Sequence, residues 1–367
     1  MSLTRWVTVG LCLASCQSAD QAPHDHSEHG DHCVNSLPDP VTSEETGGHH
    51  HSDTHKDTQT NSNEDGVFDL LSETGLYADI SDKSINSFVI PFEPKFQLWS
   101  DGADKQRWIY IPECDTIDTS DGNNWAFPVG TRMFKEFSVD GMRVETRLIT
   151  RTGTGPRDFI YTSYLWNDDE TDATRVDSAG LQDARGTAHD IPSVEQCLRC
   201  HGSYAYGGGR PSRALGFSAI QLHGASDHTT LAELDTMGVF SHPVKITHDV
   251  PGDQTTQAAL GYLHANCGNC HNSTTDGVPH VDLDLWLDVE ATTVEQTAAW
   301  TSAVGQPNTL FNDQHVAGRI VPGEPNTSAI LYRMSQRGNN AQMPPIATHT
   351  VDDNGISIIT DWIESLK

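Results

Sequence analysis

The chain has 367 residues, with 22 Lys and Arg against 51 Asp and Glu, and its formal net charge is −29. This length suits about two or three domains. The acidic balance excludes nucleic acid as a partner, because phosphate binding needs clustered cationic side chains. An acidic surface suits a basic partner protein, or simply keeps the chain soluble.

Residues 1–16 are predicted to be a lipoprotein signal peptide. Arg5 precedes an apolar run from Val7 to Leu13 that is too short to span a bilayer. The run ends at Leu13-Ala14-Ser15-Cys16, which resembles the bacterial lipobox, so Cys16 is the predicted lipidation site. The alternative is an ordinary cleaved signal in which Cys16 has no role. Lipid at Cys16 would anchor an exported protein to a membrane of the cell envelope, on its periplasmic or outer surface.

Residues 17–65 have low complexity and almost no large apolar side chains. Such a segment cannot bury enough surface to offset its ordering entropy, so a disordered tether is predicted. Its histidines can bind zinc, copper or nickel weakly, or they belong to a polar spacer with no specific role. They are His24, His26, His29, His32, His49, His50, His51 and His55.

Two cysteines, Cys33 and Cys114, remain after the others are assigned to the signal, the lipid and two motifs described below. In an oxidising compartment they can pair, which would fix the tether to the first folded domain. Two free thiols are the alternative.

Residues 66–188 show the pattern of a β-rich domain. Apolar or alternating runs are separated by turn signals at Asp121-Gly122, Asp140-Gly141 and residues 153–156. These features predict an antiparallel sheet or sandwich. The predicted strands are residues 108–111, 131–137, 143–149 and 159–166.

From residue 189 the pattern changes to short helices and loops, in a first segment over 189–250 and a second domain over 251–367. Near the C-terminus, Ile356, Ile359 and Ile363 have helical spacing and predict an amphipathic helix. The whole chain is therefore expected to be an α+β multidomain protein, with a mostly α-helical C-terminal half.

Two copies of a CxxCH motif carry the chemistry. They are Cys197-Leu198-Arg199-Cys200-His201 and Cys267-Gly268-Asn269-Cys270-His271. In such a motif both cysteines form thioethers with the haem vinyl groups, and the histidine becomes the proximal iron ligand. The sequence thus predicts two covalently bound haem c groups, with His201 and His271 as ligands. A thioredoxin-like redox pair would need a βαβ context, and a four-cysteine zinc site would not need the histidines.

The second motif has a predicted distal ligand in Met343, which is followed by Pro344 and Pro345. A loop methionine commonly occupies the sixth iron position in small cytochromes c, and proline restricts the loop. Met334 is the main competitor, although it lies in an apparently helical run.

The sixth ligand of the first haem stays open. Methionines and histidines at plausible separations compete with an open position that could bind peroxide or another small molecule. The candidates are Met133, Met142, Met237, His223, His228 and His242.

The chain resembles an uncharacterised family of bacterial two-haem c-type cytochromes. The resemblance lies mainly in Leu98–Ile109, Trp125–Thr131, Glu145–Leu148, Ile191–Cys197 and Gly261–Cys267 and covers about residues 68–367. It implies a β-rich module followed by haem-binding segments and no particular reaction. Residues 321–325 together with Met343-Pro344-Pro345 also look like the C-terminal half of single-haem cytochrome modules.

These features favour a lipid-anchored electron-transfer protein with redox partner proteins, for which its charge favours basic surfaces. The rival is a two-haem peroxidase or oxidase whose first haem is open to substrate. A third interpretation is a metal-binding surface factor that acts through its histidine-rich tail.

Overall fold

The computed structural model describes residues 67–202, 214–224, 227–245, 249–273, 281–311 and 313–366, which all fall within one structural unit. The predicted signal peptide, the lipidation site Cys16, the tether histidines and Cys33 lie outside these residues. Cys114 is in a disulfide, and the other four described cysteines are free. Among the described helices, none is long and apolar enough to cross a membrane.

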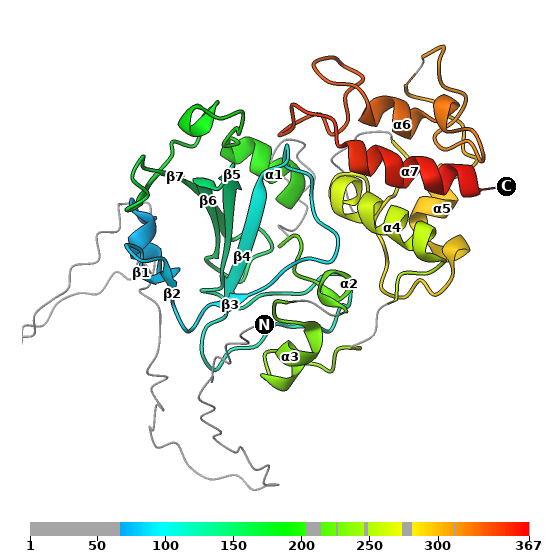
Figure 1. Ribbon diagram of the computed structural model, residues 1–367. Coiled ribbons are helices and arrows are strands. Elements are labelled where there is room, and N and C mark those ends of the chain that lie inside the picture. Colours follow the sequence, from blue (N-terminus) through cyan, green and yellow to red (C-terminus); the bar gives the residue numbers. More distant parts are fainter. Residues whose placement is uncertain are drawn as a thin grey trace, which may run out of the picture. The chain divides into compact units, whose positions relative to one another are not determined.

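The described strands form one six-stranded antiparallel sheet and a separate two-stranded ribbon, β1–β2 (Figure 1). The large sheet has the order β3-β4-β5-β6-β7-β8, so every strand pairs with its neighbours in the chain. The four predicted strands correspond to β4 to β7. The strands are β1 (Tyr77–Asp79), β2 (Ser84–Ile85), β3 (Ile90–Pro91), β4 (Asp104–Tyr110), β5 (Arg132–Val139), β6 (Met142–Arg151), β7 (Phe159–Trp166) and β8 (Ala173–Arg175).

The β5–β6 turn is the one predicted at Asp140-Gly141. Both residues have positive φ, 51° and 79°, as a two-residue type I′ turn requires, and glycine accepts such a φ without strain. Val139 and Met142 pair directly on either side of the turn.

Side chains alternate between the two faces of the sheet, because successive residues of a strand point in opposite directions. Trp108, Phe134 and Leu148 belong to a core on one face. Ile109 and Met133 belong to a second core on the opposite face. Phe217, Leu222, Leu231 and Leu234 are also part of this second core, so the segment that follows the first CxxCH motif packs onto the sheet.

The helices cluster mainly in the C-terminal half, where α4 to α7 share one core that contains Leu260, Leu263, Ile359 and Trp362 (Figure 1). The amphipathic C-terminal helix predicted from residue 356 is confirmed as α7, and the chain is a mixed α+β protein. The helices are α1 (Val194–His201), α2 (Ala219–Leu222), α3 (Leu231–Thr236), α4 (Gln254–Leu263), α5 (Ala298–Ala303), α6 (Ala329–Met334) and α7 (Asp353–Ser365). Single 3-10 turns are η1 (Leu71–Thr74), η2 (Ala184–Gly186), η4 (Val294–Gln296) and η5 (Pro325–Thr327), and η3 (His264–Gly268) is a π-helical turn.

The loop between β3 and β4 connects the sheet to the helical half. The Asp101 carboxylate accepts hydrogen bonds from the backbone N–H of His349 (2.9 Å) and Thr350 (3.0 Å) and from the Thr348 hydroxyl (2.8 Å). Burial alone would raise the pKa of Asp101, but these hydrogen bonds outweigh it and lower the pKa. The loop thereby holds the segment that follows Met343-Pro344-Pro345.

Candidate functional site

The first CxxCH motif lies on helix α1, which begins with a capping box. The Ser193 hydroxyl accepts from the Gln196 N–H (3.2 Å), and the Gln196 side chain accepts from the Ser193 N–H (2.9 Å). On a helix, positions three and four apart share a face. Cys197, Cys200 and His201 therefore project to the same side, and all three line a cavity of about 290 Å³.

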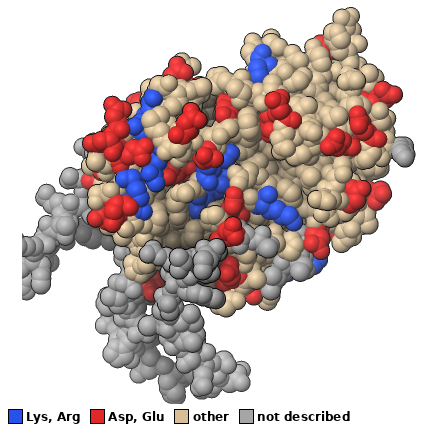
Figure 2. All heavy atoms as spheres, in the orientation of Figure 1, with Lys and Arg blue, Asp and Glu red and all other residues tan. Residues whose placement is uncertain are grey.

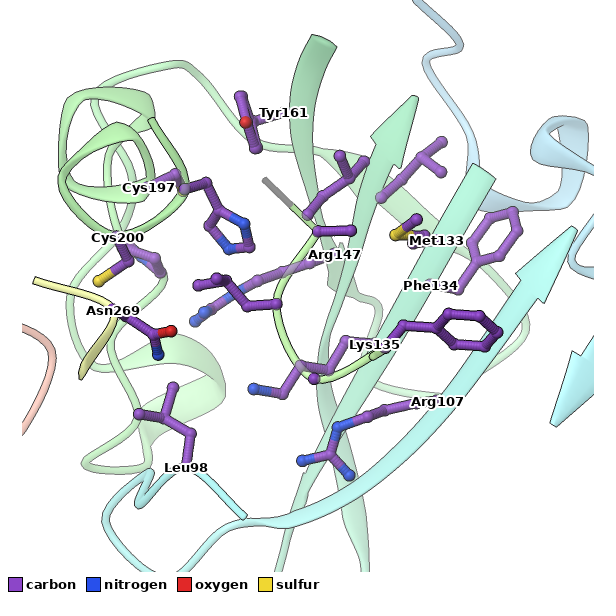
Figure 3. Close-up of a pocket in the computed structure, with 18 of the residues that line it drawn as sticks. Leu98, Arg107, Met133, Phe134, Lys135, Arg147, Tyr161, Cys197, Cys200 and Asn269 are labelled. Atoms are coloured by element: carbon purple, nitrogen blue, oxygen red, sulfur yellow. The ribbon is translucent and has the colours of Figure 1, made fainter. Parts of the chain in front are cut away.

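The cavity lies between α1 and the face of the sheet that carries Ile109 and Met133 (Figure 3). Much of its wall is apolar, and the His201 ring lies 5.4 Å from the Tyr161 ring on β7. Its apolar wall includes Phe92, Phe96, Leu98, Trp125, Phe127, Ile149 and Phe217. A large, mostly apolar cleft with a few polar groups is the usual form of a cofactor site.

Three basic side chains lie in one row on the wall of the cavity that the sheet forms. They are Arg107, Lys135 and Arg147. Lys135 on β5 pairs in register with Arg107 on β4 and with Arg147 on β6, so the three side chains point to the same face. Figure 3 shows the charged ends of Lys135 and Arg147 turned toward the side of the cavity where Cys200 lies, with the Arg107 guanidinium farther from α1. Like charges directly opposite one another on neighbouring strands are destabilising, so this row needs compensation.

Arg147 is compensated within the sheet by Glu145. The guanidinium donates to both carboxylate oxygens of Glu145, at 2.7 and 2.9 Å, and the His189 ring lies 2.8 Å from the same carboxylate. Burial alone would raise the pKa of Glu145, but the charge of Arg147 and the hydrogen bonds from His189 and Arg147 lower it to about 2. This pair fixes the orientation of Arg147 beside the motif.

Arg107 and Lys135 have no such partner in the described part of the chain. Neither has a carboxylate within ion-pair distance there, and Nη1 of Arg107, a residue only 7% exposed, is buried without a hydrogen bond. Burial, together with the neighbouring cations Arg107 and Arg147, lowers the pKa of Lys135 well below its ordinary value. The buried Nε1 of Trp125, another residue that lines the cavity, also lacks a hydrogen bond within the described residues.

The second motif follows α4 through the π-helical turn η3. Such turns occur often at functional sites. Gly268 is required here, because a Cβ at this position would lie 2.9 Å from the carbonyl oxygen of Leu285. The His271 backbone N–H donates to the Cys267 carbonyl (2.8 Å), and its own carbonyl accepts from Leu285 N–H (2.8 Å).

The imidazole of His271 is suited to bind a metal ion. Its Nδ1 is buried and has no hydrogen-bond partner among the residues that the structure describes. Burial, then the nearby charges of Arg333 and Arg319, lower the pKa of His271 to about 4. The ring is therefore neutral at pH 7, which is the form that coordinates iron.

The two motifs, far apart in the sequence, meet in the structure. The Cys270 thiol lies 3.7 Å from the Arg199 carbonyl oxygen, toward which it can donate. A hydrogen bond with Cys270 is the largest cause that raises the pKa of Cys200 well above its ordinary value. Asn269 of the second motif also lines the cavity beside the first. Cys200 and Cys270, one cysteine from each motif, are therefore neighbours.

The thiols do not resemble those of a redox-active CxxC pair, in which the thiol pKa is lowered. Burial raises the pKa of Cys267 to about 12, and burial also raises that of Cys197. In the described ranges, no group of three or more His, Cys, Asp or Glu side chains is arranged to hold a metal ion. The four cysteines are thus half-buried, and the pKa is raised for Cys197, Cys200 and Cys267.

Met343 is connected to the second motif only indirectly, through Arg333. The Met343 N–H donates to the Arg333 carbonyl (3.0 Å), and the charge of Arg333 acts on His271. Ligation by Met343 itself stays a prediction. Its competitor, Met334, is 6% exposed and belongs to the core of α4 to α7, where it fills space.

Of the six candidates for the sixth ligand of the first haem, Met133 lines the cavity. Met142 packs with Phe137 and Val144, and Met237 is 57% exposed. His223, His228 and His242 instead face the carboxylates of Asp249, Glu93 and Asp118, respectively. His264 also reaches the cavity, but its Nδ1 accepts from Leu287 N–H (3.1 Å), which leaves the proton on Nε2 and disfavours ligation through that atom.

The residues present fit a covalently attached haem. Two cysteines and a histidine open into a cavity with mostly apolar walls at the first site. The second site offers a neutral imidazole whose Nδ1 has no hydrogen-bond partner among the described residues. Sequence reasoning missed the cationic row, because the register that aligns Arg107, Lys135 and Arg147 is not visible in the spacing of these residues. No protein-family model matches the chain, and neither a curated protein nor a solved structure shows a significant match to it.

Proposed function

We propose that this protein is a two-haem c-type cytochrome that transfers electrons in the cell envelope. The observation that carries the proposal is the contact of the two CxxCH motifs through Arg199, Cys200 and Cys270. Groups attached to neighbouring sulfurs lie close together, and electron transfer between two centres needs them to be close. A protein that only stored haem would gain nothing from this arrangement.

Each cysteine and histidine of the two motifs would have a defined role in haem binding. Cys197, Cys200, Cys267 and Cys270 would hold two haem c groups as thioethers, and His201 and His271 would ligate the irons from the proximal side. When bound, haem iron supplies a one-electron Fe(III)/Fe(II) couple. The C-terminal domain would be the cytochrome c-like module, with Met343 as the distal ligand that favours Fe(II).

The location and partners in this proposal depend on the N-terminal segment. Lipid at Cys16 would anchor the exported chain, and residues 17–65 would let the acidic folded part reach its partners. Redox proteins with basic surfaces are the partners that a net charge of −29 favours.

Haem counting tests the proposal. We expect two haems per purified wild-type chain, and one in each of the double variants Cys197→Ala/Cys200→Ala and Cys267→Ala/Cys270→Ala, measured by the absorbance of the denatured, reduced protein. Each double variant is the matched control for the other. A wild-type chain with one haem or none would refute the proposal.

The first cavity is large, which supports one alternative function. This alternative is a two-haem peroxidase whose first haem is open to substrate. It predicts a high-spin first haem and turnover with hydrogen peroxide. Magnetic spectra of both redox states decide between the two classes. Two low-spin, six-coordinate irons in each state would eliminate the peroxidase.

A further inference from the structure

The row of Arg107, Lys135 and Arg147 is a set of charges without a full set of counter-charges. Glu145 binds Arg147 with both carboxylate oxygens and neutralises it. Arg107 and Lys135 stand opposite one another on β4 and β5, and neither has an ion-pair partner in the part of the chain that the structure describes. Two basic side chains therefore face the cavity without an ion-pair partner among the described residues.

Such an arrangement is costly in the absence of a ligand. A buried cation loses its hydration, and a like charge directly opposite adds repulsion. Arg107 is 7% exposed, and its Nη1 has no hydrogen-bond acceptor within the described residues. The other carboxylates nearby do not relieve it: Asp177, which also lines the cavity, accepts from the Ala179 N–H, and Glu93 acts on Arg107 only as a more distant charge.

We propose that Arg107 and Lys135 bind the two propionate carboxylates of the haem attached at Cys197 and Cys200. This inference rests on the proposed function. Haem carries two carboxylates, and the cavity beside the first motif presents two uncompensated cations on its sheet wall. Arginine and lysine are the side chains that form charge-assisted hydrogen bonds with carboxylates, and the Nε1–H of Trp125, which also lines the cavity, is a further donor.

The positions of the row and of α1 on facing walls of one cavity also match the two ends of a haem. The thioether sulfurs enter from α1, while the cations stand on the opposite wall (Figure 3). In haem c the vinyl and propionate groups lie on opposite edges of the ring. A site that binds both edges therefore needs sulfurs and cations on facing walls.

The test uses the full, haem-loaded chain and the variants Lys135→Met, Lys135→Arg and Arg107→Gln. The control is Lys245→Met, which removes one positive charge from an exposed position. We measure haem per chain, the midpoint potentials of both haems, and the propionate bands in redox-difference infrared spectra.

We expect two haems in every variant. Loss of a cation leaves the propionate charge uncompensated, which favours Fe(III), so one midpoint potential falls in Lys135→Met and Arg107→Gln. The same two variants shift the propionate bands. Lys135→Arg keeps the charge and, like Lys245→Met, leaves the potentials and the bands at their wild-type values.

Three results would overturn the inference. The first is two haems whose potentials and propionate bands are the same in all variants. The second is that Lys135→Arg and Lys135→Met both lose a sixth iron ligand to the same extent. Lys135 would then be an iron ligand. The third is binding of nitrite or inorganic phosphate that depends on Arg107 and Lys135, which would make the row a site for a free anion. A wild-type chain without haem at Cys197 and Cys200 refutes the proposed function itself.

Discussion

Single residues decide how each iron would be held. His271 offers a neutral imidazole with an unpartnered Nδ1 within the described part of the molecule, whereas His201 lies against the Tyr161 ring at the edge of a large cavity. The two sites therefore differ in their surroundings although their motifs are the same. Differences of this kind set the potential and the ligand access of a haem.

Met343→Ala is expected to lower the midpoint potential of one haem and to open its sixth position, because a thioether ligand favours Fe(II). The measurement is a potentiometric titration together with the binding of carbon monoxide to the reduced protein. Met237→Ala is the control, since Met237 is 57% exposed. If Met343→Ala keeps the wild-type potential and binds no carbon monoxide, Met343 is not the ligand.

Glu145 gives the protein a predicted dependence on pH. Its folded-state pKa of about 2 lies below the model-compound value of 4.5, so its contribution to stability is present above pH 4.5 and is lost as the pH falls toward 2. The shift corresponds to about 3 kcal/mol. Chemical unfolding of wild type at several pH values should show this loss.

In Glu145→Gln that part of the pH dependence should be missing, and the free energy of unfolding at pH 7 should fall by about 3 kcal/mol because the half-buried Arg147 loses its partner. Glu364→Gln is the control, because Glu364 is exposed. Parallel pH profiles for wild type and Glu145→Gln would contradict the assignment.

Short helices position the motifs, and α1, which carries the first motif, shows this most clearly. It has only the residues Val194–His201, so its capping box accounts for a large share of its local stability. Helix α3, Leu231–Thr236, has the same box at Thr230 and Glu233 but carries no motif. The two helices therefore form a natural pair for comparison.

Ser193→Ala and Thr230→Ala should each lower the free energy of unfolding by about 1 kcal/mol through loss of the cap. We expect Ser193→Ala alone to change the spectrum of one haem, because α1 holds Cys197, Cys200 and His201. Thermal unfolding and absorption spectra measure the two effects. Equal spectral changes in both variants would show that the helix cap has no specific role at the site.

The sequence predicted the strands, turns and helices well, but it did not predict the contacts between them. The alternation in β6, the turn Asp140-Gly141 and the helical spacing from Ile356 to Ile363 are local patterns, and the structure confirms all three. The pairing of Arg107 with Lys135 depends on register between strands. The contact of Cys270 with Arg199 depends on tertiary packing. Neither leaves a periodic signal in the chain.

At the scale of the whole molecule, charge is the dominant property. Figure 2 shows acidic side chains spread across one face, with the visible basic side chains mostly on the sheet half. The cations that matter most for the first site are instead buried or half-buried in the cavity. The outer surface and the cavity therefore have opposite electrostatic characters.

This acidity predicts how the protein meets its partners. The rate of reduction by a basic redox protein should fall ~10-fold between low ionic strength and about 0.15 M salt. Salt screens the attraction that brings the two proteins together, so association becomes slower. Stopped-flow absorbance measures the rate. A small uncharged reductant is the control and should show little dependence on salt. A salt-independent rate with the basic donor would argue against electrostatic association.

The strand order of the large sheet has a consequence for the order in which an exported chain would assemble. Because β3 to β8 pair in chain order, and Leu70, which bridges to Thr174 of β8, lies earlier in the chain, no strand has to wait for a later segment. A chain that crosses a membrane from its N-terminus presents this sheet first. The strands that carry Arg107 and Lys135 can thus pair before Cys197 emerges, whereas the residues after α1 that complete the core on this face follow it. In the proposed function, the first cofactor would be attached beside a sheet whose strands are already paired.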